Sequence, residues 1–325
     1  MKPVWRAILV LLLCHQAGAQ AATLNLAFAG DIMLDDGPGR YAANGGDTLA
    51  AVAPILARAD YRIANLETSV AANATGEANP NKIYTFRAAP DTLQALKGRF
   101  DAVSLANNHS GDYGHAAFLE TIAHLDQLGI GHVGGGKNLA AAHAPLWIER
   151  KGLKIAVLAY NEYKPRSFEA GADWPGIAWS EDSEVIADIR AARRAGADLV
   201  IPFMHWGWER EQHSDARQRK LAHAMIDAGA SMVVGSHPHV TQETESYRGR
   251  PIIYSLGNFV FDGFDKPAEK TGWILVSTLD KQGVRNWRTA EVQMDGDGIP
   301  HPSAAARTPC GQRGLSQPRL CAHAE

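Results

Sequence analysis

The chain has 325 residues, of which 46% are hydrophobic, so it is long enough to build one large α/β domain or two smaller ones around a sizeable core. Its 35 acidic and 32 basic residues nearly balance, giving a formal charge of −3 at pH 7, and no block of basic residues interrupts the sequence. This charge pattern argues against a nucleic-acid-binding protein.

The first residues have the order of a secretory signal peptide. A positively charged start is followed by an apolar run from Ala7 to Cys14 and by small residues around Ala19. The run is too short to span a bilayer. We therefore expect residues 1–21 to be removed and the mature protein to be periplasmic or secreted, with no membrane span. Cys14 leaves a lipoprotein open as the alternative, although the small residue expected just before it is absent.

Apolar runs of strand length alternate with segments of helical period along the rest of the chain. The predicted strands are 24–30, 61–66, 100–106, 129–134, 154–160, 198–204, 231–236, 251–256, 273–279 and 289–294. The predicted helices are 47–59, 90–98, 115–129, 180–196 and 214–229. This alternation predicts an α/β sheet covered on both faces. The last two strands have no helix between them and should form an antiparallel pair at one edge.

We predict one domain of catalytic size over residues 22–297 and a short tail over residues 298–325, because no repeat or low-complexity linker divides the sequence. Cys310 and Cys321 both lie in this tail, which contains Pro and Gly. An exported compartment would allow them to oxidise, so we expect a disulfide that fixes the tail. Residues 161–175, rich in charged and aromatic residues, Gly and Pro, are either a lid over the strand ends or an exposed connection.

Polar side chains follow six of the predicted strands at the point where each strand ends. They are Asp31, Glu67, Asn107-Asn108-His109, His205, the pair His237 and His239, and Asn258. Because parallel strands end at the same edge of a sheet, we expect these side chains to converge in one crevice.

Each of these residues alone is a weak signal, because a polar residue after a strand is more often a turn former. Asn107 is expected to have that role. The two histidines on either side of Pro238 are a stronger signal, because the proline holds them in a restricted, extended segment and paired imidazoles suit a transition metal. Together with the carboxylates and Asn108, they predict a hydrolytic site for Zn, Mn or Fe.

Six motifs carry a family resemblance: AGDIML, ANLETSV, SLANNHSGDYG, FMHWGWE, VVGSHPHV and IYSLGNFVFD. In this order they resemble the capsule-synthesis CapA family, also called the poly-γ-glutamate biosynthesis proteins, which is related to the calcineurin-like metallophosphoesterases. The resemblance covers about residues 24–262. It implies a four-layer α/β/β/α sandwich of the metallophosphoesterase type with two divalent metal ions at the strand ends.

The resemblance also implies roles for individual residues. One metal would take Glu67, Asn108, His205 and His237, and the other would take Asp31, Glu67 and His239. His109 would be the catalytic residue that assists the leaving group, and Asp112 is a candidate to hold its tautomer. The chain departs from the metallophosphoesterase pattern at Met33, where a histidine is expected, because a thioether is a poor ligand for such a cation.

Two functions are compatible with these patterns. The first is an exported, metal-dependent hydrolase of capsule or poly-γ-glutamate biosynthesis, acting on a phosphoester or on an amide-linked polymer. The second is a non-catalytic accessory protein that binds or guides an extracellular polymer together with capsule-assembly proteins, which Met33 mildly favours. Trp206, Trp208 and Tyr113 either form a wall for an extended substrate or pack in the interior.

Overall fold

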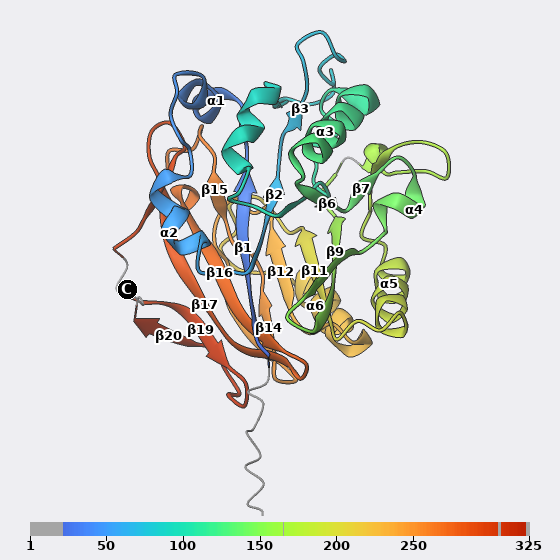
Figure 1. Ribbon diagram of the computed structural model, residues 1–325, viewed down its shortest axis with the longest axis vertical. Coiled ribbons are helices and arrows are strands. Elements are labelled where there is room, and N and C mark those ends of the chain that lie inside the picture. Colours follow the sequence, from blue (N-terminus) through green and yellow to red (C-terminus); the bar gives the residue numbers. More distant parts are fainter. Residues whose placement is uncertain (1–21, 165, 305–306, 323–325) are drawn as a thin grey trace, which may run out of the picture.

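The computed structural model describes residues 22–164, 166–304 and 307–322 and shows a mixed α/β protein with two main β-sheets (Figure 1). The predicted signal peptide, residues 1–21, lies outside the described residues, and so does Cys14. In the three described ranges, no helix is both long and apolar enough to cross a bilayer.

The first sheet has the strand order β20-β19-β17-β16-β1-β2-β5-β6. One half is parallel and consists of β1 (Leu24–Ile32), β2 (Tyr61–Leu66), β5 (Ala102–Ser104) and β6 (Gly131–Val133). The other half is antiparallel and consists of β16 (Thr271–Asp280), β17 (Gly283–Met294), β19 (Arg307–Gln312) and β20 (Arg319–Ala322). Two short strands lie outside this strand order: β15 (Asn258–Val260) pairs with β1, and β18 (Pro300–Pro302) pairs with β17.

The second sheet has the strand order β13-β14-β12-β11-β9-β8. Its four central strands are parallel: β9 (Leu153–Asn161), β11 (Leu199–His205), β12 (Val233–Ser236) and β14 (Arg250–Ile253). Antiparallel strands flank them, β8 (Leu146–Arg150) and β13 (Thr244–Tyr247). Two small sheets each hold two strands, β3 (Ser69–Val70) with β4 (Arg87–Ala88) and β7 (Gly135–Gly136) with β10 (Gly176–Ile177).

Helices pack on the outer faces of both sheets. The helical elements before β6 are α1 (Asp36–Ala43), η1 (Ala50–Val52), α2 (Ala53–Leu56), η2 (Pro90–Leu96) and α3 (Gly114–Leu128). Those after it are α4 (Leu139–Ala142), η3 (Arg166–Phe168), α5 (Asp182–Arg194), α6 (Ala216–Ala228) and η4 (Pro267–Lys270). One apolar cluster joins α2, η2 and α3 to the first sheet, and another joins α5 and α6 to the second. A third cluster lies between the sheets, where the rings of Phe28 and Phe203 meet edge to face with centroids 5.3 Å apart.

Local sequence explains how the clearest helix begins and ends. Asp215 accepts a hydrogen bond from the backbone of Gln218, and the Gln218 side chain returns one to the Asp215 backbone, so α6 begins at a capping box. It ends at Gly229, whose φ of 118° is accessible to glycine at little cost. The predicted helix over 47–59 is divided into η1 and the four residues of α2, and 90–98 forms the 3₁₀ helix η2 instead of an α-helix.

The prediction of one sheet covered by helices on both faces is wrong, because the predicted strands are divided between two sheets that pack face to face. A strand between a sheet and a helix layer has the same continuous apolar run as a strand between two helix layers, so the sequence does not separate the two cases. The antiparallel pairing of β16 with β17 is confirmed. Their position at the edge is wrong, because β19 and β20 extend the sheet beyond them.

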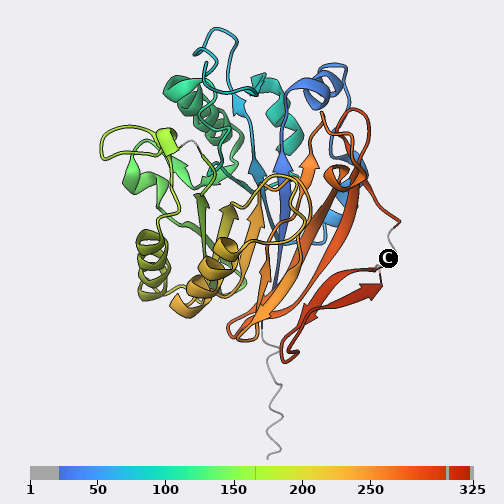
Figure 2. The ribbon, with the colours of Figure 1, turned by 180° about the vertical axis from the view of Figure 1, so that it is seen from behind.

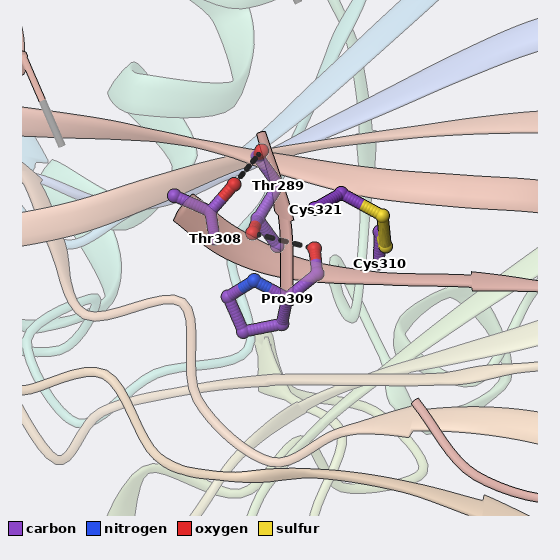
Figure 3. Close-up of a disulfide and its surroundings, with 5 residues drawn as sticks. All are labelled: Thr289, Thr308, Pro309, Cys310 and Cys321. Atoms are coloured by element: carbon purple, nitrogen blue, oxygen red, sulfur yellow. Dashed lines mark hydrogen bonds between the residues drawn. A yellow bond between two sulfur atoms is a disulfide. The ribbon is translucent and has the colours of Figure 1, made fainter. Parts of the chain in front are cut away.

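The residues predicted as a tail contribute strands β18, β19 and β20 to the first sheet. A disulfide joins Cys310 on β19 to Cys321 on β20 (Figure 3). Beside it, the Thr308 hydroxyl donates to the Thr289 carbonyl at 2.6 Å, and the Thr289 hydroxyl donates to the Pro309 carbonyl at 2.9 Å. The hairpin of β19 and β20, red in both overall views, lies at the edge of the molecule far from α3 (Figures 1 and 2).

Candidate metal centre

The six predicted ligands come from both sheets and meet beyond the carboxyl ends of parallel strands, which point to the same end of the molecule (Figure 1). The first sheet supplies Asp31 on β1, Glu67 just after β2 and Asn108 in the segment after β5. The second sheet supplies His205, the last residue of β11, and His237 and His239, which follow β12. The centre therefore lies where the two sheets adjoin.

The first group of donors is arranged around His205. Its Nε2 lies 2.7 Å from Asn108 Oδ1, 3.0 Å from His237 Nδ1 and 3.5 Å from Glu67 Oε1. Glu67, His205 and His237 are buried and each offers a ligand atom within 4.8 Å of the others. Four donors, including the amide oxygen of Asn108, thus surround one position.

The second group of donors consists of Asp31, Glu67 and His239, again buried and within 4.8 Å of one another. His239 Nδ1 lies 2.8 Å from the side-chain oxygen of Asn258, and its Nε2 lies 4.0 Å from Glu67 Oε1. Asn258 therefore orients the imidazole that belongs to this group. Glu67 belongs to both groups, which places it between two adjoining positions.

These residues fit divalent metal ions. Among the described residues, neither oxygen of Glu67 has a hydrogen-bond partner, and His237 Nε2 has none. Burial raises the pKa of Glu67 well above its ordinary value, and the nearby charge of Asp31 adds to the effect. Burial also lowers the pKa of His205 and His237 well below the ordinary value, so the imidazoles are neutral. Neutral imidazoles, carboxylates and an amide without thiolates form a donor set for Zn, Mn or Fe.

Two asparagines hold the acidic ligands in place. Asn65 donates to Asp31 Oδ1 at 2.8 Å and accepts from Asn107 Nδ2 at 3.0 Å. Asn107 accepts from the backbone N–H of His109, as expected of a turn former, and also donates to the Leu66 carbonyl at the end of β2. Asn65 was not among the predicted site residues, although an amide within the apolar strand YRIANL was an available signal.

The backbone around Pro238 is not extended, so that part of the sequence prediction is wrong. His237 has a φ of 100° and His239 a φ of 57°, values that residues with a side chain rarely adopt. Each such residue costs on the order of 1–3 kcal/mol, and residues of this kind concentrate at functional sites. The Arg210 N–H donates to the Pro238 carbonyl at 2.7 Å and supports this turn. The turn directs His237 and His239 into different donor groups.

Met33 adds no ligand to the second group. Its side chain is buried, and its sulfur accepts a hydrogen bond from the Asp35 N–H at 3.1 Å. The second group therefore has three donors where the first has four.

His109 lies beside the metal ligands in a hydrogen-bonded chain. Its Nδ1 is 2.7 Å from Asp112 Oδ2, and Asp112 Oδ1 forms an ion pair with Lys82. Burial lowers the pKa of His109, an effect that its hydrogen bond to Asp112 opposes. The ring of Phe86 packs on the imidazole with centroids 4.4 Å apart. Lys82 was missed because it lies in a polar connection whose sequence has no periodic signal.

One cavity adjoins His109, and a second cavity adjoins the first. The first, of about 460 Å³, is lined by residues that include Lys82, His109, Tyr163 and Lys164. The second, also of about 460 Å³, shares Tyr163 and Lys164 with the first and extends to Trp208. The predicted lid segment thus contributes Tyr163 and Lys164, and the Tyr163 ring lies 4.0 Å from that of His237.

The three aromatic residues predicted as either wall or packing residues have different environments. Trp206 is fully buried and its indole N–H donates to the Tyr254 carbonyl at 2.9 Å, so it packs in the interior. Trp208 is 63% exposed and lines the second cavity. The Arg87 guanidinium lies over the Tyr113 ring, 4.2 Å from the ring centroid.

The chain matches the model of a family described as "Bacterial capsule synthesis protein PGA_cap" over residues 25–263. It is 34% identical to the "PGA biosynthesis protein CapA" of Bacillus subtilis over 247 residues, which cover 74% of this chain and 63% of that protein. It is 34% identical to the "Capsule biosynthesis protein CapA" of Bacillus anthracis over 220 residues, which cover 65% of this chain and 53% of that protein. The chain thus spans less than two thirds of the length of either relative.

Among solved structures, the NAD nucleotidase of Haemophilus influenzae is similar to this chain with a TM-score of 0.46 and 13% identity. The alignment covers 87% of this chain and 54% of the nucleotidase chain.

Proposed function

The chain belongs to the PGA_cap family of bacterial capsule synthesis proteins, as its six motifs indicated, and from this membership we propose that it is a metal-dependent hydrolase. Its substrate would be a phosphoester or an amide-linked polymer of the capsule or poly-γ-glutamate type. We also infer that the two sheets with their outer helices form a four-layer sandwich of the metallophosphoesterase type.

The observation that carries this proposal is the pair of donor groups that share Glu67. Both groups are buried and adjoin each other, and the shared carboxylate has no hydrogen-bond partner among the described residues. Leaving a charged group buried without a partner is costly, so a fold retains this arrangement only where something else compensates it. Two divalent ions would compensate it, because they bind carboxylate and imidazole directly.

The remaining residues suit hydrolysis at such a centre. When bound, divalent ions supply Lewis acidity to a phosphoryl or acyl group. His109 Nδ1 lies 2.7 Å from Asp112 Oδ2 and 3.2 Å from Lys82 Nζ, so Nε2 is the ring nitrogen free to act on a substrate. Because His109 lines the cavity, its Nε2 is placed to accept a proton from an attacking group when the ring is neutral, and to give one to a leaving group when the ring is the imidazolium.

An exported location and an extended substrate are parts of the same proposal. The disulfide between Cys310 and Cys321 supports an oxidising compartment. The two adjoining cavities, with Tyr163 and Lys164 in common and Trp208 at the far side, support a substrate longer than one unit. The names of the relatives refer to PGA and capsule biosynthesis, and on this basis we propose capsule-assembly proteins as partners.

The test combines metal analysis with a substrate screen. Purified protein should contain up to two divalent ions per chain and should hydrolyse a member of a panel of phosphoesters and γ-glutamyl polymers. His109→Ala should retain the metal and lose turnover. His124→Ala is the matched control, because His124 pairs with Glu120 on α3 and lies in neither donor group. Protein without bound metal, or activity that survives His109→Ala, would contradict the proposal.

The second candidate is a non-catalytic accessory protein that holds the polymer. Met33 favours it, because its sulfur is engaged by Asp35 and the second donor group has three members. Stoichiometric metal with no turnover on any polymer, together with polymer binding, would support this candidate over the hydrolase.

A further inference from the structure

Three cavities follow one another across the candidate metal centre. The middle cavity is the one that His109 lines, and the far cavity, beside it, is the one that reaches Trp208. A third, the near cavity, has a volume of about 310 Å³ and is lined by residues that include His115. The near and middle cavities share the predicted ligand Asn108, and the middle and far cavities share Tyr163. The near and far cavities share no lining residue, so the middle cavity lies between them.

Two segments of the chain line this row of three cavities, which we call the groove. Residues 77–84, which precede β4, contribute to the near and middle cavities. The predicted lid segment, residues 161–175, contributes Phe168 to the near cavity and Lys164 to the middle and far cavities. The lid segment therefore follows the groove on both sides of the metal centre.

Each end of the groove presents a flat ring. At the near end, the His115 imidazole stacks on the Phe168 ring, with centroids 5.0 Å apart and planes 20° apart. Phe168 packs directly on the backbone of Gly111, where a Cβ would lie 2.2 Å from the ring. At the far end, Trp208 is 63% exposed. Rings of this kind give a large contact area at a low cost in conformational entropy.

The middle of the groove offers both a cation and an anion. Lys164 and Glu209 line the middle cavity, and both are exposed. An ammonium group binds carboxylates, and a carboxylate accepts hydrogen bonds from N–H groups. A chain of amide-linked units that carry carboxyl groups presents both partners, whereas the phosphate links of a phosphodiester chain present acceptors only.

We propose that the groove binds an amide-linked, carboxylate-bearing polymer through the middle of its chain and that the protein acts on internal bonds. Units would lie in the near and far cavities on either side of the metal centre. A phosphomonoester would extend from the centre to one side only. The inference rests on the proposed function in taking the metal centre as the reacting point, and it selects the polymer over the phosphoester as substrate.

The reaction would be hydrolysis of one internal amide. The C–N bond breaks, the oxygen of water bonds to the carbonyl carbon, and the protons of water are shared between the products. One product chain ends in a new carboxylate, and the other begins with a new amine. No oxidant, reductant or further co-reactant is required.

The first test is calorimetric binding of γ-glutamyl chains of defined length, with zinc present, to the full-length His109→Ala variant, in which the chains stay intact. Chains blocked at both termini should bind as tightly as free chains. His115→Ala and Trp208→Ala should each weaken binding of long chains by about 5-fold or more, as truncation of a contacting ring does. The matched controls His124→Ala and Trp174→Ala replace the same residue types outside the three cavities and should leave the affinity unchanged.

Affinity that requires a free chain terminus would overturn the proposal. Loss of affinity in only one of His115→Ala and Trp208→Ala would also overturn it, because the chain would then extend to one side of the centre only. Neither side chain is in the core, since His115 is half-buried and Trp208 exposed, so both variants should fold. Failure of every chain length to bind would refute the proposal as well.

The second test is the length of the products that the wild-type protein forms from long γ-glutamyl chains. Internal cleavage should lower the mean chain length early and give products of many lengths. Release of single units from the start would contradict cleavage of internal bonds. Binding that depends on both ends of the groove without any turnover would contradict the proposed hydrolase while supporting the binding mode, so the two failures are distinguishable.

Discussion

The substitution Glu67→Gln should have opposite effects on stability with and without metal. Glu67 is fully buried, its oxygens have no hydrogen-bond partner among the described residues, and it belongs to both donor groups. In the metal-free protein the charge of Glu67 is destabilising, and an amide of the same shape has no charge. In the metal-loaded protein the same change removes an anionic ligand from two positions at once.

The sizes of both effects follow from general values. Each pKa unit by which burial disfavours the charged carboxylate corresponds to about 1.4 kcal/mol, and an amide carries no such charge, so Glu67→Gln should stabilise the metal-free protein at neutral pH by roughly 1–3 kcal/mol. For a chain of this size, this corresponds to a rise in Tm of roughly 2–5 °C. A metal at a thousandfold excess over its Kd stabilises the wild type by about 4 kcal/mol, and Glu67→Gln should lose most of that gain.

The effect of Glu67→Gln on the stability of the metal-free protein should also depend on pH, which provides a second test. Burial, and then the charge of Asp31, raises the pKa of Glu67 well above its ordinary value of 4.5. A group whose pKa is higher in the folded than in the unfolded state stabilises the fold at low pH, and this contribution is lost as the pH rises through the folded pKa. The free energy of unfolding of Glu67→Gln minus that of the wild type should therefore grow as the pH rises from about 4.5 toward neutrality.

The assay is thermal unfolding of both proteins, with a chelator and with saturating metal. Glu162→Gln is the control, because the same chemical change at a carboxylate paired with Arg217 and Ser180 should destabilise the protein equally in both media. Our assignment of Glu67 as a metal ligand is refuted if Glu67→Gln destabilises the chelated protein, or if metal stabilises the variant as much as the wild type.

Three further predictions concern other positions. Met33→His should tighten binding of a second metal equivalent in calorimetric titration, whereas Met33→Leu should not, since only imidazole adds a suitable ligand. Trp206→Ala should cost about 3–5 kcal/mol of unfolding free energy and Trp208→Ala less than about 0.5 kcal/mol, because only the first is buried in the core. Replacing Cys310 and Cys321 by serine should cost about 2–3 kcal/mol, given the short loop that their disulfide closes, with no change in metal content.

The strand ends were predictable because their signals are local. Apolar runs mark the buried strands, and a polar residue directly after a run marks the exit from the sheet, as at Asp31 and His205. Parallel pairing then brings residues that are distant in sequence to one edge. Strand direction brings Glu67 beside Asp31 within the first sheet, and His237 and His239 beside His205 within the second. The two sets meet because the two sheets pack with their carboxyl ends at the same end of the molecule.

The supporting residues were not predictable in the same way. Lys82 reaches Asp112 across a separation of 30 residues, from a connection with no strand or helix period. The division of the strands between two sheets also leaves no local trace, because a buried strand faces apolar neighbours in either case. The left-handed backbone at His237 depends on tertiary contacts, since a residue before proline is expected in the extended region.

The candidate metal centre takes its ligands from both sheets, so a bound ion would connect them. Asp31, Glu67 and Asn108 belong to the first sheet or its connections, whereas His205 and His237 belong to the second. Any ion held by the first donor group therefore links the two sheets at their carboxyl ends, where Asp31 and Glu67 would otherwise repel each other. Away from this end the sheets are held by the apolar cluster between them, which does not depend on metal. Metal binding would thus be coupled to the packing of the two sheets at the end of the molecule where the cavities open, and we expect chelation to change the geometry of the site before it destabilises the fold as a whole.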